Sequence, residues 1–306
     1  MMLKNIKIVY SGLDNAGKTS IIKFLESKKY GLDELKPTQG IERVEIQLSM
    51  DASITQWDMG GQEKYRKEYI QRERDFHDTD LLFFIVDIND ERTDEAAEFL
   101  SEILEIFKKV NQKPKIVVLL HKKDLIEDEE RQEELVNLIK EKINAIKRDF
   151  YIRFFVTSIY DELSILNSFS IGLAEVSKKA RELNMALSKL ANKVFADAIL
   201  LIEKNGFIIG EFSKDDTSDH IIKTIYSYLS LSFMDICQSG DPATPDRMIL
   251  DWNDTGYALM ESIMIDNKLY YYIKYATGTE KIVRKFVLRS ILKSSEIIRD
   301  IIREYF

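Results

Sequence analysis

The chain has 306 residues, of which 45% are hydrophobic and 31% are charged, and this length and composition predict an ordered globular protein of two domains. A formal net charge of −8 argues against a nucleic-acid-binding protein and against a polybasic membrane binder, because both hold phosphates through clustered Lys and Arg. A single cysteine, Cys237, allows no internal disulfide and is typical of a reducing, cytoplasmic compartment, and three dispersed histidines argue against a histidine-ligated metal site.

The N-terminal half alternates short apolar runs with amphipathic stretches. Helical periodicity is expected over residues 96–107 and 135–146 and in a later helix that includes Leu173, while the acidic run Glu127 to Glu134 is expected to be a solvated helix start. This alternation predicts a P-loop-type, doubly wound α/β domain with a parallel or mixed sheet over residues 1–180. The runs that predict buried strands are Ile6 to Tyr10, Leu81 to Val86 and Ile116 to Leu120. Further strands are expected over Ile54 to Trp57 and Phe154 to Thr157.

The pattern changes from about Arg181, where a second domain over residues 181–306 is expected. Apolar runs on both sides of Asn205-Gly206 predict a β-hairpin, and a second turn is expected at Asp266-Asn267. These signals predict an α+β domain with an antiparallel sheet. Helices are expected over 183–196, 221–237 and 280–305, strands over 198–202, 207–212, 248–252, 258–265 and 269–276, and a loop over 241–246.

A phosphate-binding loop is the strongest motif in the sequence. Gly12 to Thr19 reads G-x-x-x-x-G-K-T and lies between the first predicted strand and a helical pattern. Such a loop can turn its backbone N–H groups toward a β-phosphate at a helix N-terminus, with Lys18 bridging the β- and γ-phosphates and Thr19 offering its hydroxyl to Mg²⁺. The residues expected to bind the nucleotide here are Asp14, Asn15, Ala16, Gly17, Lys18, Thr19 and Ser20.

Two further segments have the order expected of switch elements. Asp58-Met59-Gly60-Gly61-Gln62 follows a predicted strand, so that Asp58 can hold Mg²⁺, the N–H of Gly61 can sense a γ-phosphate and Gln62 can orient the attacking water. Thr38, in Pro37-Thr38-Gln39-Gly40, is the candidate that closes over the γ-phosphate and Mg²⁺. The predicted catalytic residues are Gln62, Lys18 and Thr38, and the predicted metal ligands are Thr19, Thr38 and Asp58.

The base-reading segment identifies the nucleotide. His121-Lys122-Lys123-Asp124 follows a predicted strand, and Asp124 can accept hydrogen bonds from the guanine N1–H and exocyclic amine, which adenine lacks. This argues against an ATP-using P-loop enzyme. Lys122 can lie against the base, and backbone N–H groups near Ser158 and Ile159 can meet the guanine O6. His121 stands where most GTPases have Asn.

With these motifs the sequence resembles the Ras-like small GTPases. Gly12 to Thr19 and Trp57 to Gln62 resemble the Arf family, whereas His121 to Asp124 and Thr157 to Glu162 are similar to the Rag/Gtr family, and Leu183 to Phe212 resembles that family's link into a C-terminal roadblock/longin-like domain. The second resemblance extends over nearly the whole chain. It implies a GTP/GDP switch with Mg²⁺ that hydrolyses GTP slowly without an activating protein.

The Rag/Gtr resemblance also implies partners. These are a second Rag-like subunit, in a homodimer or a heterodimer through the C-terminal domain, a roadblock-containing scaffold, and GTPase-activating and exchange proteins in nutrient signalling. No run approaches the ~18 apolar residues of a membrane helix, so we expect a cytoplasmic protein that reaches a membrane only through a partner. Two alternatives stay open: an Arf-like trafficking GTPase, and a nucleotide-bound scaffold with little hydrolysis.

Overall fold

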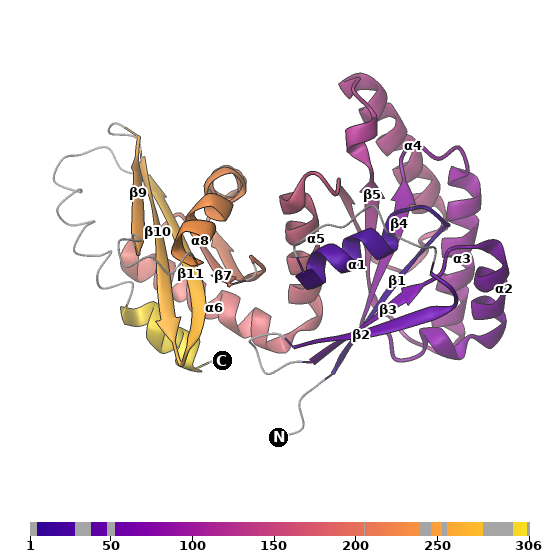
Figure 1. Cartoon of the computed structure of the whole chain (residues 1–306), viewed down its shortest axis with the longest axis horizontal. Coiled ribbons are helices and arrows are strands. Elements are labelled where there is room, and N and C mark those ends of the chain that lie inside the picture. Colours follow the sequence, from indigo (N-terminus) through magenta and orange to yellow (C-terminus); the bar gives the residue numbers. More distant parts are fainter. Residues whose placement is uncertain are drawn as a thin grey trace. The chain divides into compact units, whose positions relative to one another are not determined.

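The computed structural model of the chain describes residues 5–27, 38–47, 53–204, 206–238, 246–252, 256–277 and 296–304. It divides into two compact units, Met1–Val176 and Ser177–Phe306, a few residues before the boundary that the sequence predicts at residue 180 (Figure 1). Each unit has its own sheet and its own buried core.

The first unit is built on a six-stranded sheet in the order β2-β3-β1-β4-β5-β6. All neighbouring strands pair in parallel except β2 and β3, which are antiparallel, so the predicted P-loop-type α/β fold with a mixed sheet is confirmed. The strands are β1 (Ile6–Gly12), β2 (Ile41–Gln47), β3 (Ser53–Met59), β4 (Leu81–Asp87), β5 (Lys115–His121) and β6 (Ile152–Val156).

Helices cover both faces of this sheet. Figure 1 shows α1 and α5 on one face and α2, α3 and α4 on the other. Apolar side chains of α3 and α4 pack with those of the central strands in one continuous core. The helices are α1 (Lys18–Ser27), α2 (Glu63–Arg72), α3 (Thr93–Lys109), α4 (Glu129–Ile146) and α5 (Glu162–Val176), with short 3₁₀ turns η2 (Arg74–Phe76) and η3 (Lys123–Leu125).

Two elements of this unit were missing from the sequence prediction, and β6 begins two residues earlier than expected. The strand β2, with the sequence IERVEIQ, has exposed charged side chains at Glu42, Arg43 and Glu45, because it is the edge of the sheet and offers no buried apolar run. The helix α2 is strongly polar, and its buried residues are Arg66 and Tyr69. Neither element therefore has the apolar periodicity on which the prediction relied.

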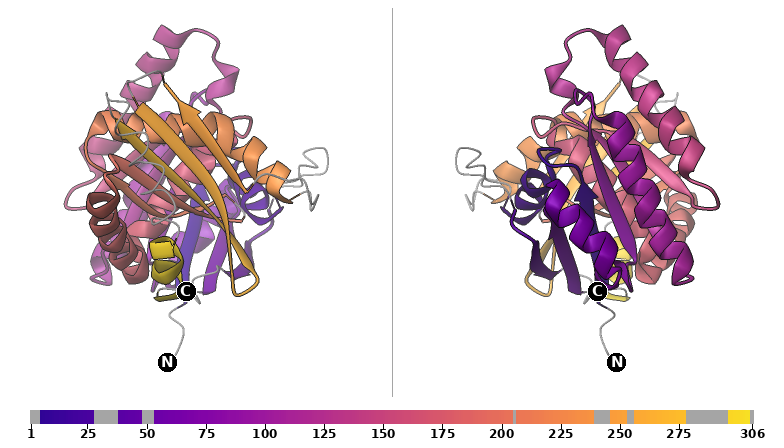
Figure 2. Two further views of the ribbon diagram at one scale, coloured as in Figure 1. Left: turned by 90° about the vertical axis from the view of Figure 1, so that its left-hand side faces the viewer. Right: turned by 90° about the vertical axis from the view of Figure 1, so that its right-hand side faces the viewer.

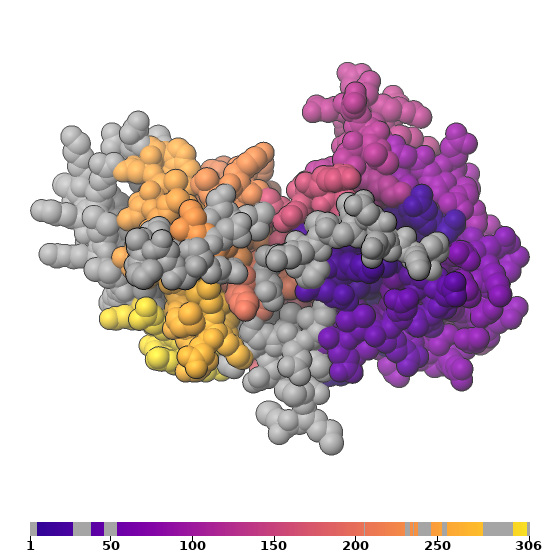
Figure 3. Space-filling model, viewed as in Figure 1, coloured from indigo at the N-terminus to yellow at the C-terminus, as the bar shows by residue number. Residues whose placement is uncertain are grey.

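The acidic start of α4 is exposed, as predicted. Asp128 caps the helix by accepting a hydrogen bond of 2.9 Å from the backbone N–H of Arg131, and Glu129 and Glu130 occupy the first turn. The magenta segment that carries α4 projects from its unit in Figure 3. Carboxylates at this position stabilise the positive end of the helix dipole.

The parallel strands place their carboxyl ends along one edge of the sheet. The strand β1 lies between β3 and β4, with Tyr10 opposite Asp58, and β4 lies beside β5, with Asp87 opposite His121. Ligands in open α/β sheets bind outside this edge. The segments that follow β1, β3 and β5 contain the three motifs found in the sequence.

The second unit is an antiparallel five-stranded sheet, in the order β8-β7-β11-β10-β9, with helices. The left-hand view of Figure 2 faces its strands. Both predicted turns are present: Gly206 has a φ of 86° after β7, and Asp266 and Asn267 have φ of 48° and 62° between β10 and β11. The elements are α6 (Lys178–Val194), β7 (Ala198–Glu203), β8 (Ile208–Ser213), α7 (Asp216–Ile225), α8 (Leu231–Gln238), β9 (Arg247–Asp251), β10 (Gly256–Ile265), β11 (Lys268–Thr277) and a helix over residues 296–304.

The helices of the second unit differ from the prediction in detail. The stretch predicted as one helix from Ile221 contains α7, a π-helical turn over Tyr226–Ser230 and α8. The helix α6 starts five residues earlier than predicted, because Ser177 caps it and the polar first turn gives no apolar signal. Asn205, most of the predicted loop 241–246, and residues 280–295 of the predicted last helix lie outside the described residues. Within the part described, none of the helices is long and apolar enough to cross a membrane.

Candidate functional site

A cavity of about 390 Å³ lies at the carboxyl edge of the first unit's sheet, against the loop between β1 and α1. Of the predicted phosphate-binding residues, Ala16 is buried behind the loop and the others line the cavity. Residues of both predicted switch segments complete the lining. The full lining is Asp14, Asn15, Gly17, Lys18, Thr19, Ser20, Thr38, Gly60, Gly61 and Gln62. Pro37 lies outside the described residues.

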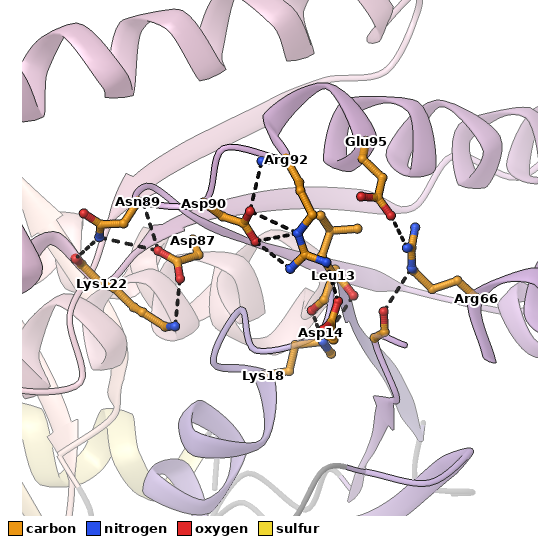
Figure 4. A network of polar contacts seen from close by, with 12 residues as sticks. Leu13, Asp14, Lys18, Arg66, Asp87, Asn89, Asp90, Arg92, Glu95 and Lys122 are labelled. Atoms are coloured by element: carbon orange, nitrogen blue, oxygen red, sulfur yellow. Dashed lines mark hydrogen bonds and ion pairs between the residues drawn. The ribbon is translucent and has the colours of Figure 1, made fainter. Parts of the chain in front are cut away.

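Lys18 is the buried cation of this loop. Its Nζ donates hydrogen bonds of 3.1 Å to the carbonyl of Gly12 and 2.6 Å to that of Leu13 (Figure 4). Burial lowers the pKa of Lys18 from 10.5 to about 8, although the carboxylates of Asp58 and Asp14 act in the opposite direction. The nearby carboxylates thus compensate only part of the cost of burying the ammonium group. A bound anion would stabilise its charge further.

Thr19, Thr38 and Asp58 converge at one end of the cavity. The Asp58 Oδ2 accepts hydrogen bonds of 2.7 Å from the Thr19 Oγ1 and 2.9 Å from the Thr38 Oγ1, and the two hydroxyl oxygens are 2.9 Å apart. The other carboxylate oxygen, Oδ1, is buried and has no hydrogen-bond partner among the described residues. Two hydroxyls and a carboxylate suit Mg²⁺, which takes few protein oxygens beside water and phosphate oxygens. The three predicted metal ligands are therefore together and fit this ion.

The second switch segment lies directly on the phosphate loop at Gly61. A Cβ atom at this position would be 2.3 Å from the backbone nitrogen of Asp14, so only glycine allows the approach. The next residue, Gln62, is exposed at the start of α2. Gly60 donates a backbone hydrogen bond of 3.0 Å to the carbonyl of Gly40, which ties this segment to the one that carries Thr38.

The helix α2 contributes two contacts that the sequence interpretation missed. The Arg66 Nε donates a 2.9 Å hydrogen bond to the carbonyl of Gly61, and the Arg66 guanidinium also pairs with Glu95 of α3. The Tyr69 hydroxyl donates a 2.6 Å hydrogen bond to the carbonyl of Gly40. The available sequence signal is the spacing of Arg66 and Tyr69, since residues three apart share one face of a helix.

His121 joins the base-reading motif to the phosphate loop. Its ring lies over Gly17, where a Cβ atom would be 2.5 Å from the His121 Cδ2, and its Nδ1 is 3.0 Å from the Thr157 Oγ1. Burial, reinforced by the neighbouring Lys122 charge, lowers the pKa of His121 to about 4. The ring is therefore neutral at physiological pH. A neutral hydrogen-bonding ring takes the position at which most GTPases have Asn.

The base-reading residues form a cluster of their own, next to the cavity lining. The Ser158 hydroxyl donates a hydrogen bond to the Asp124 Oδ1, and the exposed carboxylate of Asp124 keeps further acceptor capacity for a base. The Lys122 Nζ pairs with the Asp87 Oδ2 at 2.7 Å. Ile159 is half-buried and follows Ser158.

The end of β4 and the loop that follows it link the two ends of the site, which the sequence did not predict. At the base-reading end, Asp87 pairs with Lys122, as described above. At the phosphate end, the Arg92 guanidinium binds both carboxylate oxygens of Asp90 and donates a 2.8 Å hydrogen bond to the Asp14 Oδ1 (Figure 4). The hydrogen bonds from Arg92 lower the pKa of Asp90. Arg92 thus balances the negative charge that Asp14 brings to the phosphate loop.

Comparison with known proteins agrees with this geometry. The family described as the Gtr1/RagA G protein conserved region matches residues 7–233. The chain is 24% identical over 174 residues to Ras-related GTP-binding protein B of Rattus norvegicus, a match that covers 56% of this chain but only 46% of that relative. It is 24% identical over 210 residues to Ras-related GTP-binding protein A of Dictyostelium discoideum, covering 66% of this chain and 68% of the relative.

A third relative extends the match along the chain. GTP-binding protein GTR1 of Saccharomyces cerevisiae is 25% identical over 228 residues, which cover 70% of this chain and 73% of the relative. The family match begins at Lys7 in β1, runs through the rest of the first unit and continues into α8 of the second. The chain belongs to the Gtr1/RagA family of G proteins.

Proposed function

We propose that the protein is a molecular switch that binds GTP and GDP with Mg²⁺ and hydrolyses GTP. The observation that carries this proposal is the convergence of Lys18, Thr19, Thr38 and Gly61 on one cavity beside β1, with Asp58 hydrogen-bonded to the two threonines. Each of these groups suits one part of a Mg²⁺–nucleoside triphosphate. Membership of a G protein family supports the same conclusion.

In the proposed mechanism, Lys18 and the loop N–H groups hold the phosphate charge while water attacks the γ-phosphorus in line. Gln62, exposed at the mouth of the cavity, orients that water, and Thr38 closes over the γ-phosphate. When bound by Thr19, Thr38 and Asp58, Mg²⁺ would neutralise charge on the β- and γ-phosphate oxygens. The output of the switch is the state of Thr38 and of the segment from Asp58 to Arg74.

The preference for guanine is proposed to depend on Asp124. An ionised carboxylate accepts hydrogen bonds from the guanine N1–H and exocyclic amine, and the Ser158 hydroxyl holds that carboxylate in place. Lys122, held by Asp87, and the backbone near Ser158 and Ile159 complete the base site. Adenine offers no such donor pair, so an ATP-using enzyme is disfavoured.

Replacing the Asp124 carboxylate by an amide tests the proposed preference for guanine. In Asp124→Asn the amide N–H₂ would face the guanine amine, so GTP affinity should fall by at least ~100-fold, while xanthosine triphosphate, with a carbonyl at that position, should bind more tightly than GTP. Isothermal titration measures the affinity of each nucleotide directly, with ATP as the third. Asp128→Asn, at a helix cap where Asn serves equally well, is the matched control. Unchanged GTP affinity in Asp124→Asn, or ATP competing as well as GTP with the wild-type protein, would contradict the guanine assignment.

We also propose that the second unit is a roadblock/longin-like domain that pairs with a second Rag-like subunit, identical or different, and docks on a roadblock-containing scaffold. Exposed apolar side chains on its sheet support an interface, since Ile249 on the edge strand β9 is 46% exposed and Met264 on β10 is 61% exposed. Such a protein would be cytoplasmic, would meet a membrane through the scaffold, and would depend on activating and exchange proteins in nutrient signalling.

Sedimentation of the full chain, alone and mixed with a candidate Rag-like subunit, tests this pairing. We expect a dimer that Ile249→Glu dissociates, with Ile236→Glu, an equally exposed position on α8, as the control. If the full chain stays monomeric under both conditions, or if Ile236→Glu dissociates the dimer equally well, this surface is not the interface. The Arf-like trafficking alternative predicts a monomer, whereas the scaffold alternative predicts a dimer that hydrolyses no GTP.

A further inference from the structure

The helix α2 contains a buried cation that the proposed chemistry does not require. Arg66 is only 7% exposed, although α2 is otherwise a polar surface helix. On the same helix Arg72 is half exposed and pairs with Glu68 one turn away, as surface arginines commonly do. A guanidinium is costly to bury unless charged or polar partners compensate it, so the partners of Arg66 indicate what its burial achieves.

The partners of Arg66 belong to two different elements. Its Nε donates a 2.9 Å hydrogen bond to the carbonyl of Gly61, and its Nη2 pairs with the carboxylate of Glu95. Its guanidinium also lies over the ring of Phe99, with the Cζ 5.1 Å from the ring centroid. Glu95 and Phe99 are both on α3, which lies beside α2 in the right-hand view of Figure 2. Arg66 therefore connects Gly61 to α3. Figure 4 shows its contact with Glu95.

The helix α3 is a rigid anchor. Its inner face, which includes Phe99, Leu100, Ile103 and Phe107, is buried in the main core of the first unit. A segment that bonds to such a helix is restricted in its motion, because a close-packed core holds the helix in place. The contact with Arg66 therefore fixes the backbone conformation of Gly61. Without it this conformation would be poorly maintained, because glycine has more backbone freedom than any other residue.

Gly61 is the residue whose N–H is proposed to face the γ-phosphate. It already lies against the loop, where a Cβ atom would be 2.3 Å from the Asp14 nitrogen. The hydrogen bond from Arg66 restrains the carbonyl of the same residue, and this restrains its ψ rotation. The same face of α2 makes a second contact, because the Tyr69 hydroxyl donates a hydrogen bond to the carbonyl of Gly40. The helix is thus fixed to both segments that close the cavity.

We propose that Arg66 is a positioning residue that ties the γ-phosphate-sensing Gly61 to Glu95, and that this tie favours GTP over GDP. The inference rests on the proposed function, since only a triphosphate has a γ-phosphate for Gly61 to contact. The tie contributes to GTP binding because Gly61 is already ordered before the nucleotide binds, so less conformational entropy is lost on binding. GDP does not reach Gly61, so its affinity is independent of Arg66.

A double-mutant cycle with two nucleotides tests the proposal in the full chain. The variants are Arg66→Gln, Glu95→Gln and the double variant, with Arg72→Gln as the matched control on the same helix. Titration with fluorescent GDP and with a non-hydrolysable fluorescent GTP analogue, both with Mg²⁺, gives the two dissociation constants. We expect each single variant to raise the Kd for the GTP analogue about tenfold, as for loss of one charge-assisted hydrogen bond, and to leave the Kd for GDP within about twofold.

The double variant should be no worse than the poorer single variant, because both remove the same tie. Equal weakening of GDP and of the analogue, additive effects in the double variant, or an equal effect of Arg72→Gln would overturn the proposal. If Arg66→Gln does not fold, the variant at the half-exposed Glu95 decides alone. In that case the proposal is overturned if Glu95→Gln weakens binding of the GTP analogue no more than binding of GDP. A wild-type chain that binds neither guanine nucleotide would instead overturn the proposed function itself.

Discussion

Replacing Lys18 by alanine is expected to abolish nucleotide binding. The Lys18 Nζ is the buried cation of the phosphate loop, and it is proposed to exchange its bonds to the carbonyls of Gly12 and Leu13 for bonds to the β- and γ-phosphates. Loss of two charge-assisted hydrogen bonds in a buried site corresponds to at least ~100-fold in affinity. Isothermal titration with GDP and with a GTP analogue measures it.

The fold should survive this change. Lys18 is desolvated and its pKa is lowered, so an alanine relieves an unfavourable burial while it removes two hydrogen bonds. Thermal unfolding of Lys18→Ala should therefore stay close to that of the wild type. Lys23→Ala, at an exposed lysine of the same helix, is the control and should bind normally. Tight GDP binding by a folded Lys18→Ala protein would show that Lys18 does not hold the phosphates.

The same charge can be removed by pH. In the nucleotide-free protein burial lowers the pKa of Lys18 to about 8, and bound phosphates would raise it again. Below pH 8 the lysine is charged in both states, so affinity is at its maximum. Above it, binding must take up a proton, and affinity should fall by up to about tenfold per pH unit. Titrations near pH 9 in two buffers of different ionisation enthalpy should reveal that uptake.

The sequence predicts the site well where a motif ends a buried strand. The segments at Gly12, Asp58 and His121 each come at the end of a predicted strand, and these strands form β1, β3 and β5, which are parallel strands of one sheet. Parallel strands bring their carboxyl ends to the same edge, so residues more than a hundred positions apart become neighbours. The contact between Gly17 and the His121 ring is one result.

The sequence fails where tertiary contacts decide burial. In the sequence, Arg66 is indistinguishable from any other arginine on a polar helix. Its carboxylate partner Glu95 lies on α3, which is separated from α2 by a 3₁₀ turn, the strand β4 and a loop. The edge strand β2 has charged side chains because solvent reaches one side of it. The Asp14–Arg92–Asp90 cluster likewise depends on how the β4–α3 loop returns to the phosphate loop. Local propensity contains none of this information.

Replacing Gln62 by leucine should leave nucleotide binding intact and suppress turnover. The Gln62 side chain is exposed at the mouth of the cavity, so it adds little to ground-state affinity. In the proposed mechanism it is the group that orients the attacking water, which leucine cannot do. A loss of this kind lowers the rate of the chemical step without changing the Kd, and we expect a decrease of roughly one to two orders of magnitude.

Single-turnover hydrolysis of preloaded GTP measures this step without interference from product release. Gln71→Leu, an exposed glutamine on the same helix, is the matched control and should hydrolyse GTP at the wild-type rate. A wild-type rate of GTP hydrolysis in Gln62→Leu would mean that another residue orients the attacking water. No hydrolysis by the wild type, even with a cytosolic extract that supplies an activating protein, would favour the nucleotide-bound scaffold. The two outcomes differ in the hydrolysis rate of the wild-type protein. The experiment therefore distinguishes a wrong assignment of the catalytic residue from a scaffold protein that does not hydrolyse GTP.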